Sequence, residues 1–162
     1  MANEERSDIK VENGLAMWEI NRDGDISGLY RGMFTFRCYL DPISMIKANR
    51  EYRDLIGPNY ISAPEHETFL AYALTQLKYR VVKGPPFWSS TVEGSGFSGN
   101  IPDENIISEV LNAALDSEIL YRKQLKDRKD TALDKAKKAA EAMLAEQRAE
   151  LTDTKEESND EG

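Results

Sequence analysis

Apolar and polar residues alternate along the first part of the chain, which predicts a β-hairpin. From residue 29 to residue 40 every second side chain is apolar or aromatic, so that one strand face carries Phe34, Phe36, Cys38 and Leu40. Residues 15–20 form a shorter apolar run, and the Asp23-Gly24 step between the two runs supplies the positive φ that a tight turn needs. We therefore expect an antiparallel hairpin with one buried face.

Apolar residues then recur at helical spacing, which predicts three helices. The first begins at Asp41-Pro42, where a carboxylate can cap the helix, and ends before Gly57-Pro58. Its apolar stripe is Ile43, Ile46, Ala48, Tyr52, Leu55 and Ile56. The second helix extends from about Pro64 to about Val82, and the third begins near Asp103 and includes Leu125. A long loop rich in proline and glycine, residues 84–100, separates them.

The C-terminal quarter differs in composition from the rest of the chain. Residues 126–151 are rich in Ala, Lys, Glu and Asp, which predicts an exposed or weakly paired helix with a thin apolar stripe. Residues 152–162 carry five acids and one lysine, and we expect them to be disordered. The fold class is therefore α+β and mostly helical, with the hairpin packed on three helices. Its parts are a flexible arm (1–8), a compact domain (9–125), a charged helix (126–151) and an acidic tail (152–162).

Charge and composition exclude several classes of protein. The 162 residues include 29 acidic and 21 basic side chains, a formal net charge of −8. This argues against a nucleic-acid partner and against binding to anionic lipid, which both need a basic surface. One cysteine and one histidine exclude an internal disulfide and any metal site built from several of either residue. No apolar run would span a bilayer, and residues 1–8 lack the apolar segment of a signal peptide. We expect no cofactor and a reducing compartment.

Three motifs leave an enzymatic or ligand-binding alternative open. Residues Gly94–Gly99 match the G-x-G-x-x-G pattern, although no strand–helix–strand unit surrounds them, so a small nucleotide-binding or enzymatic domain remains an alternative. His66 and Cys38 could form a base and a nucleophile, although Cys38 falls on the apolar strand face. Residues 21–26 resemble the middle of an EF-hand loop, but the absence of flanking helices favours a hairpin turn.

Two segments are candidates for partner binding. Phe87 and Trp88 follow two prolines in the long loop, and they either fold back on the helices as a lid or anchor a partner. Residues 50–54 alternate in charge on the first helix and form either a solvated face or a polar docking edge. The candidate contact residues are Phe87, Trp88, Tyr52 and Arg53, together with the face of the C-terminal helix.

The layout of residues 29–122 resembles that of tail assembly chaperones, small assembly proteins of long-tailed bacteriophages. The resembling stretches are residues 30–37 entering 40–44, then 50–57, 72–77 with the Phe87-Trp88 loop, 101–104, and the Tyr121-Arg122 pair. The charged C-terminal helix and acidic tail depart from that layout.

The resemblance implies a non-enzymatic, mostly helical protein that oligomerises with copies of itself. It also implies binding to tail tube or tape measure proteins in the cytoplasm of the bacterial host. A structural head or tail component located in the virion fits the same residues, and so does a regulatory protein whose acidic tail imitates nucleic acid.

Overall fold

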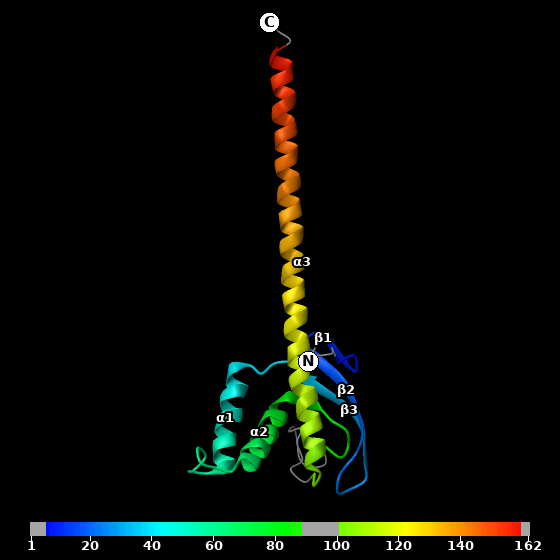
Figure 1. Ribbon diagram of the computed structural model, residues 1–162, viewed down its shortest axis with the longest axis vertical. Coiled ribbons are helices and arrows are strands. Elements are labelled where there is room, and N and C mark those ends of the chain that lie inside the picture. Colours follow the sequence, from blue (N-terminus) through cyan, green and yellow to red (C-terminus); the bar gives the residue numbers. More distant parts are fainter. Residues whose placement is uncertain (1–5, 89–100, 160–162) are drawn as a thin grey trace. The chain divides into compact units, whose positions relative to one another are not determined.

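The computed structural model describes residues 6–88 and 101–159, and its fold is α+β, as the apolar patterns predict (Figure 1). The chain divides into two units, Met1–Tyr121 and Arg122–Gly162. The first unit contains all four strands, the first two helices and the beginning of the third. The second unit contains the rest of the third helix.

One antiparallel sheet is formed by β1 (Ile9–Glu12), β2 (Leu15–Asp23), β3 (Leu29–Arg37) and β4 (Val81–Lys83), in that order. The predicted hairpin is the β2–β3 pair, in which Trp18 lies opposite Phe34. The strands β1 and β4 are additions to the prediction. Asn13 and Gly14 connect β1 to β2 with φ angles of 52° and 76°, the left-handed values of a two-residue hairpin turn. The second helix was expected to continue to Val82, but Val81 instead pairs with Phe36.

The three helices are α1 (Pro42–Ile56), α2 (Glu65–Arg80) and α3 (Glu104–Asn159). The start of α1 is as predicted, since the Asp41 carboxylate accepts a hydrogen bond from the Ser44 amide at 3.1 Å. α3 is continuous, so the predicted division at residue 126 is not a break in the backbone. The helix also includes residues 152–159, where the sequence predicted disorder. No glycine or proline interrupts residues 104–159, which explains why the helix continues.

The inner face of the sheet shares one hydrophobic core with α2 and α3, whereas none of the described residues of α1 belongs to it and that helix packs on α2 instead of the predicted hairpin. Of the four residues on the predicted strand face, Phe34, Phe36 and Cys38 are fully buried, but β3 ends at Arg37 and Leu40 is only half-buried. The helices contribute mainly alanine and branched aliphatic side chains: Ala73 and Leu77 from α2, and Ile106, Ile107, Val110, Leu111, Ala113 and Ala114 from α3. The outer face of the sheet exposes Leu15, Met17 and Met33. All the buried residues of α3 precede Arg122, so the core belongs to the first unit.

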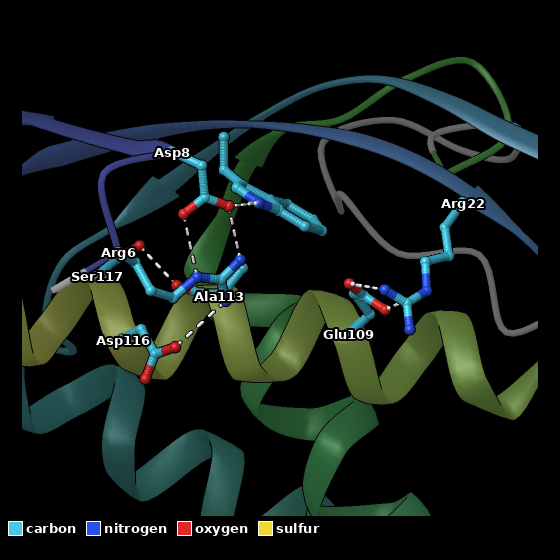
Figure 2. Close-up of polar contacts among 8 residues, drawn as sticks. Arg6, Asp8, Arg22, Glu109, Ala113, Asp116 and Ser117 are labelled. Atoms are coloured by element: carbon cyan, nitrogen blue, oxygen red, sulfur yellow. Dashed lines mark hydrogen bonds and ion pairs between the residues drawn. The ribbon is translucent and has the colours of Figure 1, made fainter. Parts of the chain in front are cut away.

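Polar contacts at the start of the chain join the strands to the first part of α3 (Figure 2). Arg6 donates to Asp8 at 2.8 Å and to Asp116 at 3.2 Å, and the Trp18 indole donates to Asp8 at 3.0 Å. Arg22 of β2 forms an ion pair with Glu109 at 3.1 Å. The prediction of a flexible arm is therefore wrong for Arg6 and Asp8, because side-chain contacts hold both of them. Residues 1–5 lie outside the described residues.

Candidate protein-binding surface

Helix α1 is the most exposed element of the first unit. Of its fifteen residues, all of them described, only Ala48 is buried. It packs against α2, as Figure 1 shows, and its remaining circumference is open to solvent. A helix normally buries an apolar stripe, so an amphipathic helix that buries one alanine leaves side chains available for another molecule.

Glu51 fixes α1 to α2 through two hydrogen-bond donors on α2. The Lys78 ammonium lies 3.0 Å from the carboxylate, and the Tyr79 hydroxyl donates to the same group. Partial burial acts to raise the pKa of Glu51, but the hydrogen bonds from Tyr79 and Lys78 outweigh it and lower the pKa overall. The carboxylate, in turn, raises the pKa of Tyr79 to about 12. These hydrogen bonds fix the orientation of α1 against α2.

Replacing Glu51 by glutamine should bring the pKa of Tyr79 down toward its ordinary value of 10.0, because the neutral amide no longer repels a phenolate. The measurement is a spectrophotometric tyrosine titration of the folded protein, with Tyr79→Phe as the control that assigns the shifted step. If Glu51→Gln leaves the high-pH titration step unchanged, the Glu51–Tyr79 contact is not formed in solution.

The exposed side of α1 combines isoleucine with basic residues. We call the α1 outer face the set Ile43, Ile46, Lys47, Arg50 and Arg53. Their spacing of three and four residues places them on one side of the helix. Ile43 is 65% exposed and Ile46 is 60% exposed, although the sequence pattern placed both in the buried stripe. Arg53 lies with its guanidinium 5.5 Å from the centre of the Tyr60 ring. The face is therefore both apolar and basic.

The structure separates the two residues that the sequence proposed on this helix. Arg53 is exposed and belongs to the α1 outer face. Tyr52 is half-buried and lies four residues after Ala48, on the side of the helix that packs against α2. Ile43 and Ile46 are the contact candidates that sequence reasoning missed. The signal that could have found them is helical spacing, since Ile43 lies seven residues before Arg50 and Ile46 lies seven residues before Arg53.

Trp88 is a core residue, so the prediction that it anchors a partner is wrong. Its side chain is fully buried, and its ring packs edge-on against Phe34 with centroids 5.2 Å apart. Phe87 is half-buried and packs against Tyr30 at 4.9 Å. The alternative prediction of a segment that folds back on the core fits both side chains. The ring contacts of both side chains are with Tyr30 and Phe34 of β3.

The residues proposed for catalysis lie in different surroundings. Cys38 is fully buried, and this burial, with a smaller contribution from Glu118, raises its pKa to about 11. A thiol with a raised pKa is a poor nucleophile near neutral pH. His66 is exposed, and its Nε2 lies 3.1 Å from the Glu104 carboxylate. No hydrogen bond joins Cys38 to His66. The Gly94–Gly99 motif lies outside the described residues.

The segment that resembles an EF-hand is a hairpin turn attached to the start of α3. The Gly24 amide donates to the Gly28 carbonyl at 3.0 Å and closes the turn. The buried Asp103 carboxylate accepts from the Ser27 amide at 3.2 Å and from the Tyr30 hydroxyl at 2.6 Å. Burial acts to raise the pKa of Asp103, but the hydrogen bonds from Ser27 and Tyr30 outweigh it, so that the pKa falls to about 2.

Within residues 6–88 and 101–159, no group of three or more His, Cys, Asp or Glu side chains is placed to hold a metal ion. None of the helices described there is long and apolar enough to cross a membrane. No family model matches the sequence, and no match was found among the curated proteins or among the solved structures.

Proposed function

We propose that this protein is a non-enzymatic assembly factor that binds another protein through the α1 outer face. The observation that carries the proposal is the exposure of Ile43 and Ile46 beside Arg50 and Arg53 on a helix whose single fully buried residue is Ala48. The partner is a protein segment that presents apolar and acidic residues together, most simply an amphipathic helix.

The chemistry of this face fits such a partner. Full burial of an isoleucine side chain contributes on the order of 1.5–3 kcal/mol, and Ile43 and Ile46 still expose more than half of theirs. Arginine presents a planar fork of donors that matches a carboxylate, so Arg50 and Arg53 favour acidic residues beside the apolar contacts. Because its cap and the Glu51 cluster already order α1, binding does not have to order the helix.

The environments of Cys38 and His66 favour binding over catalysis. Burial raises the pKa of the Cys38 thiol to about 11, and the His66 ring contacts the Glu104 carboxylate and not the thiol. The resemblance to tail assembly chaperones supplies the biological setting of the proposal, with tail tube or tape measure proteins as partners. A permanent head or tail component of the virion is the second candidate, and it would be found in purified particles. The nucleotide-binding alternative rests on residues 94–99 alone.

The test is co-expression of the full chain with the product of each adjoining gene, followed by size-exclusion chromatography. We expect one of these proteins to elute with the wild-type chain, and we expect the double variant Ile43→Asp, Ile46→Asp to lose that complex. Introducing two carboxylates removes the apolar contact and repels an acidic partner, and both sites are exposed, so the fold should survive.

The matched control is the double variant Thr131→Asp, Ala145→Asp. It adds the same two charges at exposed sites on the other unit of the chain. The control should keep the complex. The proposal fails if no adjoining gene product binds, or if the Ile43→Asp, Ile46→Asp variant binds as well as the control.

A further inference from the structure

The described part of the second unit is an exposed helix. Every side chain from Arg122 to Thr154 is exposed, including five large apolar ones: Leu125 (39%), Leu133 (59%), Met143 (64%), Leu144 (53%) and Leu151 (65%). Helices in proteins obtain most of their stability from packing an apolar side against a partner. This part of α3 therefore has the residues for such packing and no packing partner within its own unit.

Charge is divided unequally along the same helix. Residues 122–138 contain eight basic and three acidic side chains, a net charge of +5. Residues 139–159 contain six acidic and two basic side chains, a net charge of −4. The sign changes at residue 138. Two copies aligned in parallel would place like charges together, whereas two antiparallel copies would place each basic half beside an acidic half.

We propose that two copies of this chain associate through an antiparallel pair of α3 segments, residues 122–154, centred on Lys138. In this register residue 126 of one copy lies at the same height along the pair as residue 150 of the other. At every height the residue numbers of the two facing copies add up to 276. The register places the exposed apolar residues at shared levels along the pair. Leu133 with Met143 and Ala136 with Ala140 face each other in the seam, and Leu125, Leu144 and Leu151 lie beside it.

The centre of this register has the spacing of a coiled coil, with Leu133, Ala136, Ala140 and Met143 in the seam, whereas the seam positions toward the ends are Lys126, Lys129, Gln147 and Glu150. Positions 126, 133, 140 and 147 form one heptad series, and positions 129, 136, 143 and 150 form the other. In an antiparallel pair each member of one series faces a member of the other, which brings Leu133 to Met143 and Lys126 to Glu150. The alanines at positions 136 and 140 allow the two helices to approach closely at the centre.

Within the seam of this register Lys126 of one copy faces Glu150 of the other, and beside it Lys123 lies level with Asp153. Asp130 lies level with Glu146, which is a like-charge pair. The pairs Lys135–Glu141 and Arg128–Arg148 both lie on the outer side of the two helices, so they do not decide the register. All the residues of this pairing belong to the second unit, and none of them is part of the α1 outer face. The outcome of the pairing is therefore independent of the proposed binding of another protein.

The first test is the molar mass of the full chain by light scattering over a wide range of protein concentration. We expect the mass to rise toward twice the monomer value of 18.3 kDa. The variant Leu133→Asp, Met143→Asp should remain monomeric. The control Thr131→Asp, Ala145→Asp adds the same charge on the outer side of the helix pair and should still dimerise. A wild-type chain that stays monomeric, or a control that fails equally, overturns the proposal.

The second test is disulfide cross-linking of Lys126→Cys mixed with Glu150→Cys, both in a Cys38→Ala background. Antiparallel pairing brings these two positions together, whereas two copies of one position lie about 36 Å apart along the helices. We expect the mixture to cross-link and each variant alone to remain uncross-linked. Cross-linking of each variant with itself would indicate a parallel pair and contradict the proposal. Circular dichroism of each variant confirms that the helix is retained.

Discussion

Replacing Trp88 by alanine should lower the free energy of unfolding by about 3–5 kcal/mol, the usual range for removing a large buried aromatic ring. The side chain is fully buried and packs edge-on against Phe34, which is fully buried as well. This result would establish Trp88 as a core residue and not a contact for partners.

The measurement is urea unfolding followed by circular dichroism. Phe69→Ala is the control, because Phe69 is an aromatic residue that is 40% exposed and should contribute much less to stability. A Trp88→Ala variant as stable as the Phe69→Ala control would mean that the ring does not occupy the core in solution. Trp88 would then again be a candidate contact for a partner protein.

Removing the Asp103 carboxylate should destabilise the protein and abolish part of its acid sensitivity. Asp103 is buried and accepts hydrogen bonds from Ser27 and Tyr30, which together attach the β2–β3 turn to the start of α3. Asp103→Ala leaves these donors without their acceptor, and an unsatisfied buried donor is more costly than a lost exposed contact. We expect stability to decrease in the order wild type, Ser27→Ala, Asp103→Asn, Asp103→Ala.

The pH dependence follows from the lowered pKa of Asp103, about 2 against an ordinary value of 3.8. Between these values the unfolded chain binds a proton that the folded protein does not, so the folded state loses stability as the pH falls. The contribution of Asp103 is complete above about pH 4 and disappears as the pH approaches 2. Thermal unfolding midpoints of wild type and Asp103→Asn should therefore converge over this interval. Parallel curves would exclude an ionised Asp103 in the folded protein.

Local signals in the sequence were sufficient for part of the fold. The period-two pattern identified the buried face of β3, and Asp41-Pro42 and Gly57 marked the ends of α1. The Asn13-Gly14 pair is an equally local signal for the β1–β2 turn, and it was overlooked. β4 carried no comparable signal, because three residues at the end of a helical pattern become a strand only when β3 offers an edge to pair with.

The candidate surface was harder to predict because periodicity does not distinguish a buried stripe from an exposed one. Ile43 and Ile46 have the spacing of core residues, and their exposure depends on how α1 sits against α2. The basic side of the helix was visible in the sequence, which is why Arg53 was identified correctly as exposed. Trp88 is the opposite case, a buried residue that the sequence pattern placed in an exposed loop. Its burial depends on tertiary packing, which the local sequence does not encode.

Isothermal titration calorimetry with the purified partner measures binding of another protein to the α1 outer face. Relative to wild type, the Ile43→Asp, Ile46→Asp variant should bind at least about tenfold more weakly, a loss of about 1.4 kcal/mol or more. The Thr131→Asp, Ala145→Asp control should bind with wild-type affinity. Equal affinity of the wild-type chain and the Ile43→Asp, Ile46→Asp variant would contradict binding through this face.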